Sequence, residues 1–339
     1  MKIEFTSLHQ IDHILNKIEE IDISNQSEDL HDYIVKLLEE ITKSDNKRSF
    51  EFKSETTEVR IAIEKILNGS YNEGVKINTN RLLDIEIKAQ SQIDHLDKMI
   101  QKGSFFQALL VDTDEKVIVL TKADHNQFID EIDFTLKKGL PWDKRIFKAF
   151  LVKFDNEHNI KNIYVYDTTN RTARYWWDGY LELKEKYTDS HNTKTSLYIL
   201  DRKIFDPIKR NYPADHTYLR NSTIRYFRSN DEFVLNDFLE QNFINYIPVD
   251  PDFPKEKIVN KIKELPEKWK FDYRFVIKKD EIKKKIINII PLTEKIDLVF
   301  KDFIENINSI IIAWKDAEGN KYLKIKTDEG YNRFNKVNE

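Results

Sequence analysis

Hydrophobic residues recur at helical spacing through most of the first hundred residues. A first helix is predicted after a cap at Ser7 from the apolar residues Ile11, Ile14, Leu15, Ile18 and Ile21. A second helix is predicted over residues 27–41, beginning at Ser27, with a buried face made of Leu30, Tyr33, Ile34, Leu37, Leu38 and Ile41. Two more helices are predicted over residues 59–67, before Gly69, and about 80–101, before Gly103. Alternation over residues 49–53 predicts a short strand between them.

The pattern changes after Gly103 to short β-branched and aromatic runs. Strands are predicted over residues 105–111, 117–121, 147–154 and 160–167, so residues 104–168 are expected to form an antiparallel sheet. Helix is expected to dominate residues 172–264. The tail predicts strands over residues 273–278, 285–290, 309–315 and 322–327, the last two joined by a turn at Gly319.

This order of elements lacks the βαβ alternation of a doubly wound sheet. We therefore predict an α+β fold with a mainly helical N-terminal part, a central antiparallel sheet, a helical segment and a C-terminal antiparallel β element. Residues 1–200 and 201–339 are predicted to form two domains, or else one compact unit.

Composition restricts the class of protein. Hydrophobic residues make up 40% of the 339 residues, which excludes disordered and low-complexity classes. The chain has no cysteine, so disulfides, thiolate metal sites and cysteine nucleophiles are absent. We find neither a signal peptide nor an apolar run approaching the roughly 20 residues of a membrane span. A cytoplasmic protein without membrane contact is expected.

Charge is unevenly distributed along the chain. Residues 1–60 carry 14 Asp and Glu against 8 Lys and Arg, while five of the 13 arginines lie between Arg202 and Arg228. Guanidinium groups interleaved with aromatic rings are typical of phosphate binding. The predicted DNA-binding residues are Arg202, Lys203, Lys209, Arg210, Arg220, Arg225, Arg228, Lys278, Lys279, Lys283, Lys284 and Lys285. For the lysine group at 278–285, a solvated strand edge is an equally good interpretation.

One pattern invites a catalytic interpretation, that of a nuclease. The residues from Arg210 to His216 resemble the Arg and His signature of helical HEPN ribonucleases. Pro213 lies inside the spacer and would break the helix that this geometry needs, so a helix-ending turn is the preferred interpretation.

Four other groups of residues have simpler explanations than catalysis or ligand binding. Glu51 with Lys53, and Glu86 with Lys88, could hold a metal-bound phosphate, but surface ion pairing is preferred for both. His9 and His13 share a helical spacing and are predicted to be polar surface residues, not zinc ligands. The aromatic group formed by Tyr175, Trp176, Trp177 and Tyr180 is predicted to be core and not a platform for bases. No catalytic residue, metal or cofactor is predicted.

The order of segments resembles the bacterial nucleoid-associated family called YejK or NdpA, over nearly the full length of the chain. The resemblance is carried by residues 11–14, the 27–41 helix leading into 50–52, the 107–111 and 117–122 hairpin, and residues 147–152, 163–167, 174–181 and 322–327. It implies a cytoplasmic DNA-associated protein of the nucleoid, with an α+β fold and a role in chromosome organisation or in handling foreign DNA. It supplies no catalytic residues.

We therefore predict a non-catalytic, sequence-tolerant protein that binds double-stranded DNA, and we expect a homodimer because two-fold symmetry would double the phosphate contacts. The net charge of −4 and the acidic N-terminal part depart from a chromosome-coating protein. Two alternatives stay open. One is a defence-associated nuclease using Arg210 and His216 or a carboxylate-bound metal. The other is an adaptor that binds a protein partner through its acidic N-terminal helices.

Overall fold

The chain folds into two compact units. A computed structural model describes residues 2–25, 28–44, 47–96, 98–112, 115–129, 132, 135–142, 147–168, 173–282 and 287–335. Unit 1 comprises Met1–Thr188 with Asp272–Arg274, and unit 2 comprises Asp189–Phe271 with Phe275–Glu339. The boundary predicted between residues 200 and 201 falls inside a continuous helical run of unit 2.

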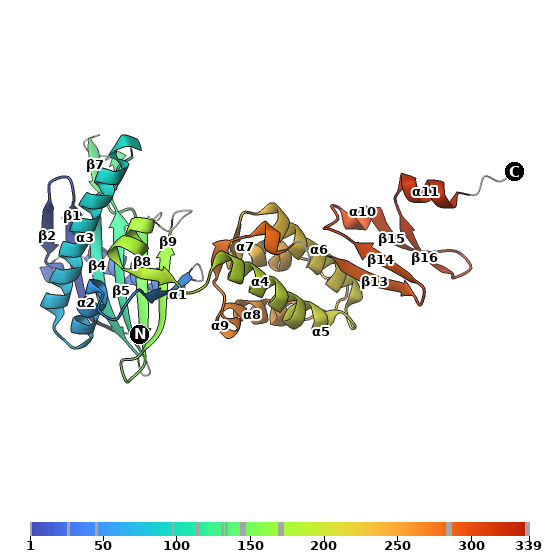
Figure 1. Ribbon diagram of the computed structural model, residues 1–339, viewed down its shortest axis with the longest axis horizontal. Coiled ribbons are helices and arrows are strands. Elements are labelled where there is room, and N and C mark those ends of the chain that lie inside the picture. Colours follow the sequence, from blue (N-terminus) through green and yellow to red (C-terminus); the bar gives the residue numbers. More distant parts are fainter. Residues whose placement is uncertain are drawn as a thin grey trace. The chain divides into compact units, whose positions relative to one another are not determined.

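Unit 1 is built on an antiparallel sheet, drawn at the blue and green end of Figure 1. In the described residues this sheet has eight strands, in the order β10-β3-β9-β8-β5-β4-β1-β2. They are β1 (Lys2–Asp12), β2 (Lys17–Ile21), β3 (Arg48–Phe52), β4 (Gly103–Val111), β5 (Lys116–Asp124), β8 (Phe147–Phe154), β9 (Ile160–Asp167) and β10 (Leu183–Glu185). The antiparallel sheet predicted for residues 104–168 is confirmed, and the α+β class with it. A separate hairpin joins β6 (Asn126–Ile129) to β7 (Leu136–Gly139).

Helices cover both faces of this sheet. Helix α1 (Glu28–Lys43) packs on one face through Tyr33, Ile34, Leu37, Leu38 and Ile41, as predicted from the sequence, while Leu30 of the predicted face is only partly buried. Ser27, the predicted first residue, lies outside the described residues. Helices α2 (Glu58–Leu67) and α3 (Tyr71–Ile93) cover the other face together with the π-helical turn η3 (Tyr175–Tyr180). Two short 3-10 turns belong to unit 1: η1 (Ile23–Asn25) precedes α1, and η2 (Asp94–Leu96) follows α3.

Coverage on both faces explains why the central strands are apolar almost without interruption. Phe105 belongs to the core beneath α3, whereas its neighbour Phe106 belongs to the core beneath α1. Trp176 and Tyr180 are fully buried in the core beneath α3, so the prediction that the aromatic group is core is confirmed.

The helix predicted from residues 11 to 21 is wrong, because this segment is the β1–β2 hairpin. The Asp12 carboxylate accepts hydrogen bonds from the backbone N–H groups of Ile14 and Leu15, which closes a turn between the strands. These two apolar residues are 65% and 70% exposed at its tip. Their helical spacing is therefore a property of the hairpin's loop and not of a buried face.

The helix predicted over residues 80–101 was placed too late. Helix α3 begins at Tyr71 and ends at Ile93, and Gly103 is the first residue of β4. Gly74 obscured the start because glycine is a poor helix former. Here it allows α3 to approach α2 closely, since a Cβ atom at Gly74 would lie 2.5 Å from the carbonyl oxygen of Ala62.

Unit 2 is mainly helical. Its helical elements are α4 (Asp189–Leu200), η4 (Asp201–Phe205), α5 (Asp206–Ile208), α6 (Pro213–Ser229), α7 (Leu235–Leu239), η5 (Glu240–Ile244), α8 (Lys255–Lys263), α9 (Leu265–Trp269), η6 (Lys279–Glu281), α10 (Ile307–Ile310) and α11 (Asp328–Phe334). A buried aromatic cluster of Tyr226, Phe227, Phe233, Phe238 and Phe275 holds α6 and α7 together. Strands β11 (Glu232–Val234) and β12 (Arg274–Val276) pair beside it, and β10 and β11 interrupt the helical stretch predicted for residues 172–264.

The C-terminal part of unit 2 forms two hairpins. The first pairs β13 (Asn288–Thr293) with β14 (Ile296–Phe300), and the second pairs β15 (Ile311–Lys315) with β16 (Lys321–Ile325). Residues 307–310, partly predicted as strand, form α10 instead. The predicted turn at Gly319 is confirmed by its φ of 93°. None of the described helices has the length and apolar character needed to cross a bilayer.

The chain returns once from unit 2 to unit 1. Asp272 is buried there, and its Oδ1 accepts a hydrogen bond of 2.7 Å from the backbone N–H of Ser49 at the start of β3. The Nε of Arg48 lies 3.9 Å from Oδ2 of the same carboxylate. The start of β3, the second strand of the large sheet, is therefore held by a residue that follows most of unit 2 in the sequence.

Candidate nucleic-acid interface

The cations predicted to bind DNA lie on a succession of helices in unit 2. Arg202 and Lys203 are in η4, and Lys209 and Arg210 lie in the turn between α5 and α6. Arg220, Arg225 and Arg228 are in α6. The side chains of Lys209, Arg210 and Arg225 are exposed, and none of the three makes an ion pair within the described residues.

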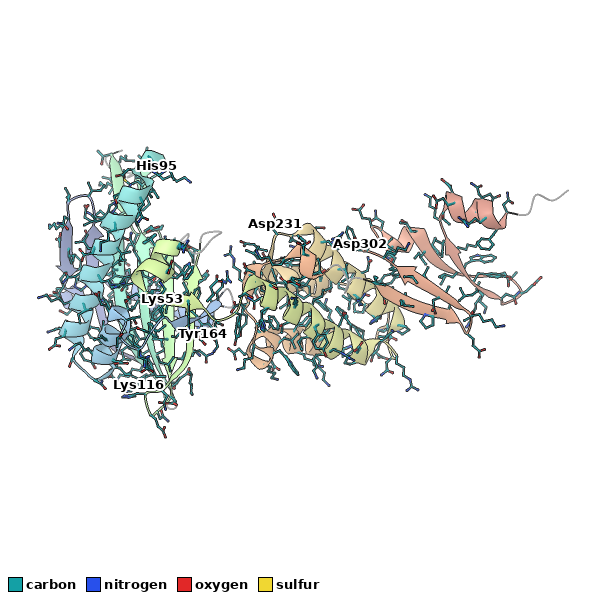
Figure 2. The ribbon with its side chains drawn as sticks, viewed as in Figure 1. Lys53, His95, Lys116, Tyr164, Asp231 and Asp302 are labelled. Carbon is teal, nitrogen blue, oxygen red and sulfur yellow. The ribbon has the colours of Figure 1, made fainter. Side chains whose placement is uncertain are left out.

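Two arginines of α6 are already paired with carboxylates. Arg220 is largely buried and makes two contacts with Asp201, from Nε to Oδ1 at 2.9 Å and from NH2 to Oδ2 at 3.3 Å. Arg228 donates to Asp302 at 2.7 Å, and Figure 2 labels this aspartate beside the C-terminal hairpins. Both guanidinium groups would have to leave these partners to contact a phosphate. They are therefore structural cations of unit 2.

The lysine group at residues 278–285 is divided in the same way. Lys279 Nζ donates to the carbonyl oxygens of Phe227, Arg228 and Asn230 at the end of α6. It satisfies carbonyls that a helix leaves unpaired, and burial lowers the pKa of Lys279. Lys278 is exposed, with Nζ 3.9 Å from the carboxylate of Asp189. Lys283, Lys284 and Lys285 lie outside the described residues.

Cations and aromatic rings meet where η4 contacts α8 and α4 contacts α9. Figure 1 shows α4, α8 and α9 close together. The Arg202 guanidinium lies 5.8 Å from the ring centroid of Tyr198, and Lys203 Nζ lies 4.7 Å from the ring centroid of Trp269. Lys261 Nζ donates to the Lys203 carbonyl oxygen at 2.6 Å, which joins α8 to η4. We call Tyr198, Arg202, Lys203, Lys261 and Trp269 the cation–aromatic patch.

The patch keeps an excess of positive charge. Arg202 is 61% exposed, and its only nearby carboxylate in the described residues is Asp206 at 3.5 Å, itself exposed. Lys203 and Lys261 make no ion pair there. Exposed pairs contribute little and are screened by salt, so three cationic groups stay accessible to an anion. Lys261 and Trp269 were missed from the sequence because they lie about sixty residues after η4.

Arg210 and His216 do not form an open acid–base pair. The predicted helix break is confirmed, since α6 begins at Pro213, between the two residues. The His216 imidazole is 5% exposed and packs edge to face against Phe205 at 6.2 Å. Burial, with the positive charges of Lys209 and Arg220, lowers the pKa of His216 to about 4. The ring is therefore a neutral core residue near pH 7.

Unit 1 contains a cluster of charged residues that sequence reasoning missed. Lys122 and Glu86 have side chains with 0% exposure, and Nζ lies 2.5 Å from Oε1. Lys148 Nζ lies 3.4 Å from Oδ2 of Asp124, and His13 Nδ1 lies 3.9 Å from Oε2 of Glu86. We call His13, Glu86, Lys122, Asp124 and Lys148 the buried charge cluster. Lysines at 122 and 148, in strands rich in apolar residues, were its signal in the sequence.

The structure of unit 1 corrects two predictions. His9 and His13 are buried and not surface residues, and burial lowers the pKa of both. Glu86 is in the core instead of a surface ion pair with Lys88. By contrast, the surface ion pairing predicted for Glu51 and Lys53 is confirmed: Glu51 pairs with Lys184, and Lys53 with Asp178.

Across the described ranges, no three His, Asp or Glu side chains gather in the way that metal ligands would. Comparison of the chain with models of known protein families and with characterised proteins gave no match.

Proposed function

We propose that this protein binds double-stranded DNA without sequence preference, through the cation–aromatic patch of unit 2, as a component of the bacterial nucleoid. The observation that carries the proposal is the patch itself, where three accessible cations lie beside two exposed aromatic rings. A guanidinium and two ammonium groups suit the phosphates of a nucleic-acid backbone.

The rings position the cations. Contact with Tyr198 restricts the Arg202 side chain and contact with Trp269 restricts Lys203, so less rotamer entropy is lost when a phosphate binds. The hydrogen bond from Lys261 Nζ to the Lys203 carbonyl oxygen restricts the third cation in the same way. Because phosphate contacts carry no direct sequence information, binding of this kind is sequence-tolerant.

The other predicted cations differ in what they can add. Lys209 and Arg210 are exposed after α5 and would extend the phosphate contacts. Replacing Arg220 or Arg228 would leave the carboxylate of Asp201 or Asp302 unpaired and would therefore destabilise unit 2. A variant that combines Arg220, Arg225 and Arg228 would therefore confuse folding with binding.

The test is a salt titration of binding to a random duplex. In the variant Arg202→Gln/Lys203→Gln/Lys261→Gln we expect weaker binding to every sequence and a salt slope reduced by up to about 2.7, since each lost contact contributes about 0.9. The matched control, Lys17→Gln/Lys43→Gln/Lys184→Gln, removes three exposed lysines of unit 1 and the same net charge. Its slope should not change. Equal slopes in the two variants would contradict the proposal.

The same samples test the two alternatives. Incubation with Mg²⁺ and labelled DNA or RNA measures cleavage, and cleavage lost in His216→Ala would support the nuclease. No binding at low salt would favour the adaptor, for which the exposed acidic residues Glu28, Asp29 and Asp32 of α1 are a suitable surface. The expected homodimer is tested by light scattering at the protein concentrations used for binding.

A further inference from the structure

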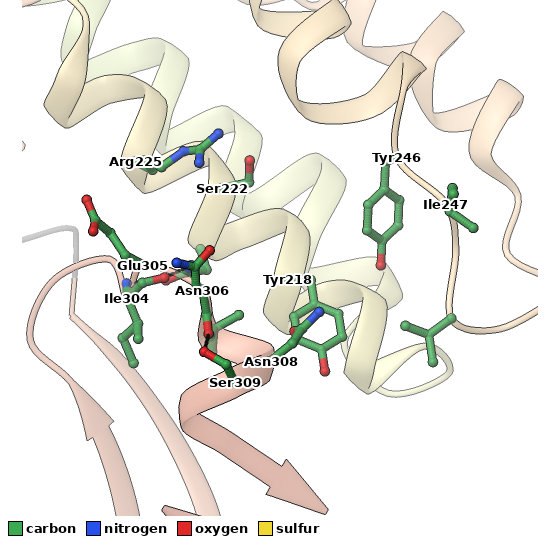
Figure 3. A pocket seen from close by; sticks show the side chains of 13 residues that line it. Tyr218, Ser222, Arg225, Tyr246, Ile247, Ile304, Glu305, Asn306, Asn308 and Ser309 are labelled. Carbon is green, nitrogen blue, oxygen red and sulfur yellow. Dashed lines mark hydrogen bonds between the residues drawn. The ribbon is translucent and has the colours of Figure 1, made fainter. Parts of the chain in front are cut away.

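A pocket of about 710 Å³ lies beside α6 in unit 2 (Figure 3). It is formed by α6, by the segment after η5 and by the loop that leads into α10. Its volume is in the range of about 300–1,000 Å³ that is usual for small-molecule sites. Arg225 belongs to this pocket and lies outside the cation–aromatic patch.

Hydrogen bonds hold the walls of the pocket in place. Tyr246 OH donates to Asp215 Oδ1 at 2.7 Å, and the Val249 N–H donates to the same oxygen at 2.7 Å. On the other side, the Asn221 amide donates to the carbonyl oxygen of Ile304 at 2.9 Å and accepts from its N–H at 2.8 Å. Because these groups are already satisfied, the pocket is preformed and does not depend on a ligand for its shape.

Other polar groups in the pocket are uncommitted. Within the described residues, no hydrogen bond or ion pair is made by Arg225, the Tyr218 hydroxyl, the Glu305 carboxylate or the side-chain amides of Asn306 and Asn308. Figure 3 shows Arg225 and Glu305 toward one end of the pocket and Tyr218 with Asn308 toward the other. The pocket therefore offers a cation, an aromatic ring, amides and one carboxylate to a single ligand.

These groups define the chemistry of that ligand. Arg225 suits a phosphate. The Tyr218 ring suits a planar base, and asparagine amides pair with base edges. The Glu305 carboxylate can accept hydrogen bonds from hydroxyl or amino groups, as acidic residues do from a ribose in nucleotide sites. Its negative charge repels a ligand that carries only anionic groups.

We propose that the α6 pocket binds a nucleoside phosphate, with its phosphate on Arg225 and its base along Tyr218. The ligand is either a free nucleotide or one unpaired nucleotide of a longer strand, because the recognised chemistry is the same. This site is separate from the cation–aromatic patch and does not require that patch to bind DNA.

Calorimetry on the full chain tests the proposal with AMP, GMP, CMP and UMP, and with adenosine and inorganic phosphate as partial ligands. We expect at least one nucleotide to bind about tenfold or more tightly than either partial ligand. Arg225→Gln should weaken that nucleotide about tenfold, the loss of roughly one charge-assisted contact. Asn308→Ala should weaken it by a smaller factor.

The matched control is Arg333→Gln, which removes an exposed arginine of unit 2 outside the pocket and should leave nucleotide affinity unchanged. Circular dichroism confirms that each variant is folded. The proposal is overturned if no nucleotide binds more tightly than phosphate, or if Arg225→Gln and Arg333→Gln have equal effects.

Two further arms separate this site from the interface. The triple variant Arg202→Gln/Lys203→Gln/Lys261→Gln should keep full nucleotide affinity even if duplex binding fails, and loss of nucleotide binding there would contradict a separate site. Competition by a short single strand against the bound nucleotide identifies the polymer as the source of the ligand, and its absence identifies the free nucleotide.

Discussion

The buried charge cluster of unit 1 and the cation–aromatic patch of unit 2 place cationic side chains in opposite environments. In unit 1, Lys122 is fully buried and contacts Glu86 at 2.5 Å, beneath helix α3 that covers one face of the sheet. In unit 2, Arg202 and Lys203 lie at the surface against aromatic rings. The same type of residue stabilises a core in one unit and stays accessible in the other. The difference lies in whether the fold brings a carboxylate into a dry environment beside it.

The comparison also applies within unit 2. Arg220 and Arg225 are five residues apart on α6, yet Arg220 is held by Asp201 and Arg225 faces a pocket. A count of charges along the chain treats these residues as equivalent. Their roles are separated only by the partners that the fold supplies.

The largest effect is expected from breaking the buried pair of unit 1. Lys122→Met leaves the Glu86 carboxylate uncompensated in the core, which should lower the free energy of unfolding by about 3–5 kcal/mol. The double variant Lys122→Met/Glu86→Gln should recover most of that loss. Urea denaturation followed by circular dichroism measures both. A single variant as stable as the double one would show that the pair is not in a dry core.

Acid should destabilise unit 2 through His216. The folded-state pKa of His216 is about 4, below the value of about 6.5 expected in the unfolded chain. The unfolded state therefore binds more protons between these values, and stability falls as the pH drops from about 6.5 to about 4. The loss should be on the order of 3 kcal/mol.

His216→Phe provides the control for this acid effect because it keeps an aromatic ring against Phe205 and removes the titrating group. Its denaturation midpoint should depend less on pH across the same window. His9 and His13, whose pKa values are also lowered by burial, should retain an acid sensitivity in unit 1. An unchanged pH dependence in His216→Phe would contradict the assignment.

A smaller effect is expected for Lys279, whose side chain caps the last carbonyl groups of α6. Lys279→Met removes the donors to the carbonyl oxygens of Phe227 and Arg228 and should lower stability by about 1–2 kcal/mol. Lys278→Met, at the exposed neighbouring residue, should have little effect in the same thermal denaturation experiment. Equal effects would mean that Lys279 is also a surface cation.

The smallest effect is expected at a surface pair of unit 1. Lys43 contacts Glu39 one helical turn earlier at 3.1 Å, and both side chains are well exposed. Lys43→Gln should change the free energy of unfolding by no more than about 0.5 kcal/mol. A loss of several kcal/mol would remove the distinction between buried and exposed cations on which the comparison depends.

The sequence pattern alone predicted the limits of an element correctly where turn residues lie next to it. Strands β8 and β9 were predicted with their observed limits because apolar runs end at the polar loop around Asp155 and Asn159. The first hairpin was misread because β1 finds its partner β4 about a hundred residues later, and helical spacing contains no such information. Its turn depends on a single carboxylate, that of Asp12.

The candidate sites were only partly predictable for a similar reason. Arg202 and Lys203 stood out in the sequence, but Trp269 and Lys261 join them only through the packing of α8 and α9. The pocket wall at Glu305 and Asn306 lies some eighty residues from Arg225. Contacts of this kind depend on tertiary structure and not on periodicity.

Asp272 has a consequence for synthesis of the chain on the ribosome. Translation at roughly 5–20 residues per second would complete residues 1–188 about 4–17 s before Asp272 is made. During that interval the N–H of Ser49, at the start of β3, lacks its acceptor from Asp272. The last step in folding of the N-terminal unit therefore follows the emergence of most of the helical unit, and a nascent chain arrested at residue 200 would leave the N–H of Ser49 without this acceptor.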